Sequence, residues 1–184
     1  MAPGNVPRNG ALSDLYLLRH AKAVPAEDGG ADRERPLEPR GRRAAQAIGA
    51  WIGEHHLVPD LVLCSPSLRT RQTLDLVTPG FDRPPKIMLE EALYLPSADR
   101  LLARLRRVPA SINSVLLVGH NPGFHELALF LTETASGPLL ARLGGFPTGA
   151  MARFEIGLPW SALGRRTARL TGVINPKELV RGIE

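Results

Sequence analysis

The chain has 184 residues, of which 43% are hydrophobic and 22% are charged, and its formal net charge is +5. This length and composition are typical of one globular domain, and no apolar run approaches the roughly 20 residues that span a bilayer. The lone Cys64 excludes an intramolecular disulfide, which fits a reducing, cytoplasmic location. We expect one domain over residues 13–184, preceded by a polar, Gly/Pro-rich disordered leader at 1–12.

The positive charge suggests an anionic partner, although arginine richness can equally reflect a coding bias. Lysine is rare and occurs only as Lys22, Lys86 and Lys177. The basic residues are spread along the chain and aromatic residues make up only 5% of it, which does not favour a nucleic-acid binder. We therefore expect no nucleic acid and no membrane as partners, and a monomeric protein.

The first half of the chain alternates short apolar runs with amphipathic stretches. The run at 15–19 predicts a buried strand, and residues 40–56 predict a helix after a long polar loop at 23–39. A second strand is expected at 60–65. The stretch 65–77 predicts a helix with Ser65 as its N-cap and Pro66 at its first position.

The second half continues this alternation. The pattern indicates a strand within 85–93, a helix at 98–108, a strand at 114–120 and a helix at 121–133 capped by Asn121. Two late strands are expected at 150–157 and 167–176, after a turn-rich loop at 144–150. Strands that alternate with helices predict an α/β fold, specifically a three-layer α/β/α sandwich with a mostly parallel central sheet and antiparallel late strands.

Three predicted strands end on residues that carry protons or bind anions. His20, Ser65 and His120 stand at these ends, and Arg69 lies just inside the helix that follows Ser65. Ligands of open α/β sheets bind beyond the carboxyl ends of the strands, where helix N-termini also favour anions. The sequence therefore predicts an anion site lined by Arg19, His20, Arg69 and His120, and phosphate suits arginine forks best.

Several designs for phosphate chemistry do not fit these residues. None of the lysines follows a glycine, as a P-loop requires. Cys64 and Arg69 are one residue closer together than in a cysteine phosphatase, so Cys64 is expected in the core. No HExxH motif occurs, so a metal site is unsupported. The remaining design is a neutral histidine that attacks phosphorus.

At this point the chain resembles a known family. The sequences RHA at 19–21, SPSLRTRQT at 65–73 and VGHNPG at 118–123 are similar to motifs of the histidine phosphatase superfamily, which has a phosphoglycerate mutase-like fold. Ala21 replaces the glycine that usually follows the histidine. RHAKA at 19–23, RPL at 35–37, RG at 40–41 and FPTGA at 146–150 resemble the branch around the phosphohistidine phosphatase SixA. The resemblance covers residues 14–175.

The resemblance implies a role for each matching residue. His20 is expected to be the nucleophile, with Arg19, Arg69 and His120 completing the phosphate pocket and no metal or cofactor. Larger relatives carry an acidic general acid after the third strand, where this chain has Glu90 and Glu91. Lys22 and Arg35 are expected at the mouth of the site, and Asp32 and Arg40 are further candidates for its lining. A solvated loop position explains Lys22 equally well and explains the other three residues better.

The hypothesis is therefore a metal-independent phosphatase that acts through phosphorylated His20. Its best substrate is a protein phosphohistidine, such as a phosphotransfer domain, because a short chain without lid insertions leaves the site open to a protein surface. The alternatives are a small-molecule phosphomonoesterase acting on a sugar phosphate or nucleotide, and a non-catalytic phosphate-binding module. A mutase is less favoured, because no lid segment is evident.

Overall fold

A computed structural model of the chain describes residues 12–26, 30–133 and 137–180. Except for Leu12, the predicted leader at 1–12 lies outside the described residues. One six-stranded sheet runs through the molecule in the order β3-β2-β4-β1-β5-β6. Its strands are β1 (Ser13–Arg19), β2 (Leu61–Cys64), β3 (Lys86–Leu89), β4 (Ser114–Gly119), β5 (Met151–Ile156) and β6 (Arg169–Ile174).

The direction of the strands confirms the predicted sheet. Strand β1 pairs in parallel with β4, β4 with β2, and β2 with β3. The late strands β5 and β6 are antiparallel, β5 against β1 and β6 against β5. Parallel strands place their carboxyl ends at one edge of the sheet, so the residues that follow β1, β2 and β4 all emerge on the same side.

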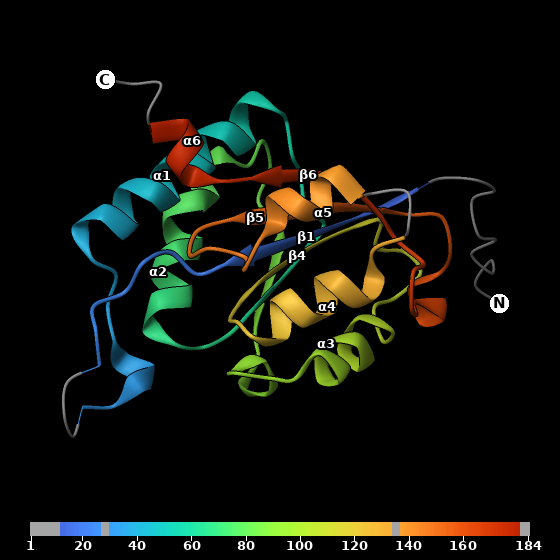
Figure 1. Cartoon of the computed structure of the whole chain (residues 1–184), viewed down its shortest axis with the longest axis horizontal. Helices are drawn as coiled ribbons and strands as arrows, with labels where there is room; N and C mark the ends of the chain where they lie inside the picture. Colours follow the sequence, from blue (N-terminus) through green and yellow to red (C-terminus); the bar gives the residue numbers. More distant parts are fainter. Residues whose placement is uncertain (1–11, 27–29, 134–136, 181–184) are drawn as a thin grey trace, which may run out of the picture.

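Helices cover both faces of this sheet, which confirms the three-layer α/β/α fold (Figure 1). The helices are α1 (Pro39–Glu54), α2 (Leu68–Val77), α3 (Ala98–Leu105), α4 (Gly123–Leu131), α5 (Gly137–Leu143) and α6 (Pro176–Val180). One buried cluster joins the sheet to α1 and α2, and the other joins it to α3, α4 and α5. The short helices α5 and α6 were not predicted from the sequence.

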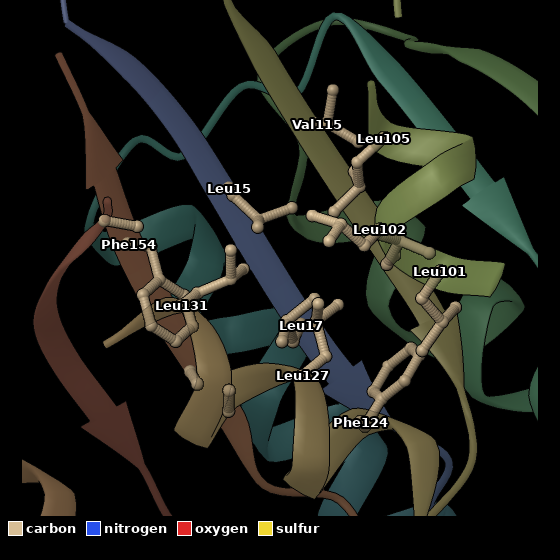
Figure 2. Close-up of a cluster of buried hydrophobic side chains, with 14 of the residues drawn as sticks. Leu15, Leu17, Leu101, Leu102, Leu105, Val115, Phe124, Leu127, Leu131 and Phe154 are labelled. Atoms are coloured by element: carbon tan, nitrogen blue, oxygen red, sulfur yellow. The ribbon is translucent and has the colours of Figure 1, made fainter. Parts of the chain in front are cut away.

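The central strand β1 supplies apolar side chains to both clusters. Successive side chains of a strand point to opposite faces. Leu15 and Leu17 therefore belong to the cluster with α3 and α4, whereas Tyr16 and Leu18 belong to the cluster with α1 and α2. Figure 2 shows Leu17 beside Leu127 of α4 in the first of these clusters. Burial on both faces explains why β1 is a continuous apolar run.

Two helices begin later than the sequence predicted. Helix α2 starts at Leu68 instead of following Ser65 directly, and α4 starts at Gly123. The predicted capping roles of Ser65 and Asn121 are wrong, because the capping positions belong to Ser67 and Pro122 and neither makes a side-chain cap bond. The side chains of Ser65 and Asn121 are thus available for long-range contacts.

The two faces of α4 provide a matched test of the packing. Leu127→Ala should lower the free energy of unfolding by about 2–5 kcal/mol, because Leu127 is fully buried and its truncation leaves a cavity. Leu129→Ala, on the same helix but 46% exposed, should change it by less than about 0.5 kcal/mol. Urea unfolding of both variants measures the difference. Equal losses would contradict the described orientation of α4.

Candidate active site

A cavity of about 310 Å³ opens at the carboxyl ends of β1 and β4. Six residues predicted for the site line it: Arg19, His20, Lys22, Arg35, Arg69 and His120. Asp32, Leu95 and Asn121 line it as well. The structure thus brings together side chains from β1, α2, the loop after β4 and the long loop that begins after β1.

His20 has one ring nitrogen held and the other free to react. Its Nδ1 lies 2.8 Å from the carbonyl oxygen of Ala21, so Nδ1 carries the proton and donates it to that oxygen. The lone pair is then on Nε2. The backbone of Ala21 is itself anchored, because its amide donates to Thr73 Oγ1 at 3.0 Å. Burial, with smaller contributions from nearby guanidinium groups, lowers the pKa of His20 to about 4, so the ring is neutral at pH 7.

His120 lies next to His20, with the two ring centroids 5.2 Å apart. Its Nε2 is 2.7 Å from Ser65 Oγ, and its Nδ1 is 3.5 Å from a guanidinium nitrogen of Arg69. Burial lowers the pKa of His120 to about 3, which keeps this ring neutral too. Because a guanidinium can only donate, Nδ1 accepts from Arg69 in this contact, and the ring proton is on Nε2, which donates to Ser65 Oγ.

Arg19 and Arg69 carry the fixed positive charge of the cavity. Arg19 extends from the end of β1 and donates from Nη1 to the carbonyl oxygen of Phe146 at 2.7 Å. Arg69 comes from the first turn of α2 and is 2% exposed. Within the described part of the chain, the Nε atoms of both side chains are buried and have no hydrogen-bond partner. Both arginines line the cavity, where their fixed positive charges favour a bound anion.

Asp32 lines the cavity, although the sequence analysis favoured a solvated loop position for it. It accepts hydrogen bonds from the Tyr94 hydroxyl at 2.6 Å, Arg35 Nη1 at 2.7 Å and Arg69 Nη2 at 2.9 Å. These bonds, that from Tyr94 foremost, hold the pKa of Asp32 well below its usual range. The carboxylate is therefore ionised at neutral pH and orients the guanidinium of Arg69. The unusual length of the loop was the one sequence signal for it.

The two predicted acids do not reach the cavity. Glu90 forms a two-pronged ion pair with Arg104, with both N–O distances at 2.7 Å. Glu91 is exposed and pairs with Arg33 in the same way. Neither carboxyl lines the cavity, because both pair with arginines outside it. The geometry gives no support to a general-acid role for either residue.

Cys64 lies in the core at the end of β2, as the spacing to Arg69 predicted. Its side chain is fully buried and its thiol donates to the Ser65 carbonyl oxygen at 3.2 Å. Burial raises the pKa of this thiol to about 12, so no thiolate forms at neutral pH.

The loop after α5 supports the arginine of β1. Phe146 adopts a left-handed backbone conformation with φ 53°, and its carbonyl oxygen accepts hydrogen bonds from Arg19 and from Asn121 Nδ2 at 3.1 Å. Asn121 Nδ2 also lies 2.9 Å from the Gly145 carbonyl oxygen. The asparagine predicted as a helix cap therefore links the ends of β1 and β4 to this loop.

No group of three or more His, Cys, Asp or Glu side chains among residues 12–26, 30–133 and 137–180 is arranged to hold a metal ion. In the same ranges, every helix is too short or too polar to cross a bilayer. A larger cavity of about 550 Å³ between α2 and β3 contains no histidine among its lining residues.

Comparison with known proteins gives matches over most of the chain. The family model of the histidine phosphatase superfamily (branch 1) matches residues 15–93. An uncharacterized protein of Mycobacterium tuberculosis is 33% identical over 165 residues, covering 87% of this chain and 100% of that protein.

Solved structures match the fold closely. A protein from Nakamurella multipartitia assigned as a phosphohistidine phosphatase SixA superposes with a TM-score of 0.80 and 32% identity, covering 91% of this chain and 99% of that one. The phosphoglycerate mutase of Bacillus anthracis, at 13% identity, shares the fold with a TM-score of 0.67, covering 96% and 99% of the two chains.

The buried neutral histidines predict a pH-dependent stability. The folded pKa values of about 4 and about 3 lie below the unfolded value of 6.5, so the unfolded chain binds more protons between these limits. The free energy of unfolding should therefore fall as the pH drops from 7 to 5. Urea unfolding at several pH values measures this slope. His20→Asn and His120→Asn should each flatten it, and an unchanged slope in both variants would contradict this explanation.

Proposed function

The chain belongs to the histidine phosphatase superfamily, on its SixA-like branch, and from that premise we propose that this phosphatase hydrolyses protein phosphohistidine through His20 without a metal ion. A phosphatase of this family needs a neutral imidazole aimed at phosphorus and cations around the phosphoryl oxygens. The contacts of His20, Arg19, Arg69 and His120 support each part of this requirement.

In the first step, the lone pair of His20 Nε2 forms a bond to phosphorus while the bond from phosphorus to the substrate nitrogen breaks. The electron pair of that broken bond stays on the substrate imidazole. His20 keeps its Nδ1 proton, donated to Ala21, so the phosphorylated ring is cationic and is a good leaving group for the second step.

In the second step, water attacks the phosphorus of phosphorylated His20. The new P–O bond replaces the bond from phosphorus to Nε2, and the electron pair of the broken bond returns to Nε2, so His20 is neutral again. One proton of the water stays on the phosphate, and the other passes to the solvent, which supplied a proton to the leaving imidazole. Arg19 and Arg69 hold the phosphoryl oxygens throughout, with His120 beside them in the cavity.

The observation that carries the choice of substrate is the state of Asp32. Among the described residues that line the cavity, Asp32 is the carboxyl group, and its hydrogen bonds keep it ionised. An alkoxide leaving group needs a proton donor, which an ionised Asp32 does not provide. An imidazole accepts a proton from water on its second nitrogen and leaves as a neutral ring. The cavity therefore favours cleavage of a P–N bond.

The proposed role of His20 as the nucleophile can be tested by mutation. In EDTA, the protein should hydrolyse a phosphohistidine protein faster than p-nitrophenyl phosphate, and His20→Ala should lower both rates by about 10⁴-fold or more. His55→Ala, an exposed histidine stacked on Trp51 away from the cavity, is the control and should retain activity. Full activity of His20→Ala, or loss of wild-type activity in EDTA, would contradict the proposal.

The same assays test whether Glu90 or Glu91 takes part in catalysis. Glu90→Gln and Glu91→Gln should each leave both rates within about twofold of wild type, because their carboxyls pair with arginines outside the cavity. Steady-state rates on both substrates test this, with the melting temperature recorded to detect loss of the Glu90–Arg104 pair. A selective loss on an alkyl phosphate assayed beside them, whose alkoxide leaving group needs a proton, would identify the affected glutamate as an acid.

A further inference from the structure

Leu95 is an exposed apolar side chain at the mouth of the active site. Six large apolar side chains among the described residues are substantially exposed: Leu12, Ile87, Leu89, Leu95, Leu129 and Phe130. Of these, Leu95 lines the cavity that contains His20 and His120, and it is 51% exposed. The same cavity is lined by the cationic residues Lys22 and Arg35 and by the carboxylate of Asp32. The apolar side chain of Leu95 offers neither a charge nor a hydrogen-bond donor to a phosphate group.

The backbone of Leu95 is also held in an unfavourable conformation. Its φ is 47°, in the left-handed region that glycine or asparagine adopts more readily than leucine. Such conformations persist only where the surrounding structure imposes them, and they cluster at functional sites. Leu95 combines this unfavourable backbone conformation with a residue exposure of 51%. Packing within the folded chain therefore does not explain why a leucine occupies the position.

The residues on either side fix Leu95 in place. The preceding Tyr94 donates its hydroxyl to Asp32, which in turn holds Arg69. The following Pro96 packs its carbonyl against Gly123 at the start of α4, where a Cβ would lie only 2.2 Å from the Pro96 oxygen. Leu95 is therefore presented from a rigid support that is tied to the phosphate site on one side and to α4 on the other.

We propose that Leu95 is a contact that selects protein substrates, by packing against an apolar side chain next to the phosphohistidine of the partner. This inference rests on the proposed function and adds a substrate requirement to it. A small phosphate ester or free phosphohistidine has no such side chain and gains nothing from Leu95. A protein surface that carries phosphohistidine beside an exposed apolar residue would cover the leucine while its phosphate enters the cationic cavity.

The test compares two substrates with the same scissile bond: a phosphotransfer domain phosphorylated on histidine, and the free amino acid phosphohistidine. Leu95→Asn keeps a residue that tolerates a positive φ but removes the apolar contact. This variant should lower kcat/KM for the phosphorylated protein about tenfold, mainly by raising KM. A loss of this order is expected when about half of a leucine side chain is no longer buried against the partner. Turnover of free phosphohistidine should stay within about twofold.

Two further variants complete the experiment. Leu95→Met should restore most of the kcat/KM for the protein, because it returns an apolar side chain of similar volume. Leu129→Asn, a comparably exposed leucine outside the cavity, should leave both substrates unaffected. Melting temperatures should show that Leu95→Asn is as stable as wild type or more so, since the strain is relieved.

The outcomes separate this inference from the proposed function. If the wild type cleaves both substrates and Leu95→Asn lowers them equally, or lowers neither, Leu95 is not a protein contact and the inference is overturned. If the wild type cleaves p-nitrophenyl phosphate but no form of phosphohistidine, the proposed function itself fails, and the substrate role of Leu95 fails with it.

Discussion

The parallel pairing of β1 with β4 is the contact on which the site depends. Arg19 lies opposite Gly119 in this ladder, and the amide of His20 donates to the Gly119 carbonyl oxygen at 3.0 Å. The pairing sets His20 and His120 side by side at adjacent strand ends. Gly119 is needed at this position because a Cβ there would lie 2.8 Å from the ring of Phe124. The apolar burial of both strands on both faces holds this register.

Around these strand ends, the molecule keeps two imidazoles neutral among arginines. Burial and the positive charges act in the same direction on His20 and His120, lowering both pKa values. Asp32 offsets part of that charge and holds Arg69 by its carboxylate and its backbone carbonyl. The result is a neutral His20 imidazole at pH 7 next to cationic side chains, as the proposed attack on a phosphoryl group requires.

The site also concentrates backbone strain at its rim. Phe146 and Leu95 both adopt left-handed backbone conformations, and in each case one group of the residue faces the site. For Phe146 it is the carbonyl oxygen that receives Arg19 and Asn121. For Leu95 it is the exposed apolar side chain beside the cavity. The long loop with Asp32 completes the rim through Tyr94, the residue before Leu95.

Local periodicity and the residues at strand ends were enough to predict the six strands, the four longer helices, the three-layer fold and the grouping of Arg19, His20, Arg69 and His120. The contacts of single polar side chains could not be predicted in this way. Ser65 and Asn121 match local capping patterns, yet they bond to His120 and to the loop at Phe146. The physical reason is that a polar side chain bonds to whichever partner the packed chain brings within about 3 Å. Such partners, as for Asp32 and Arg69, are often far apart in the sequence.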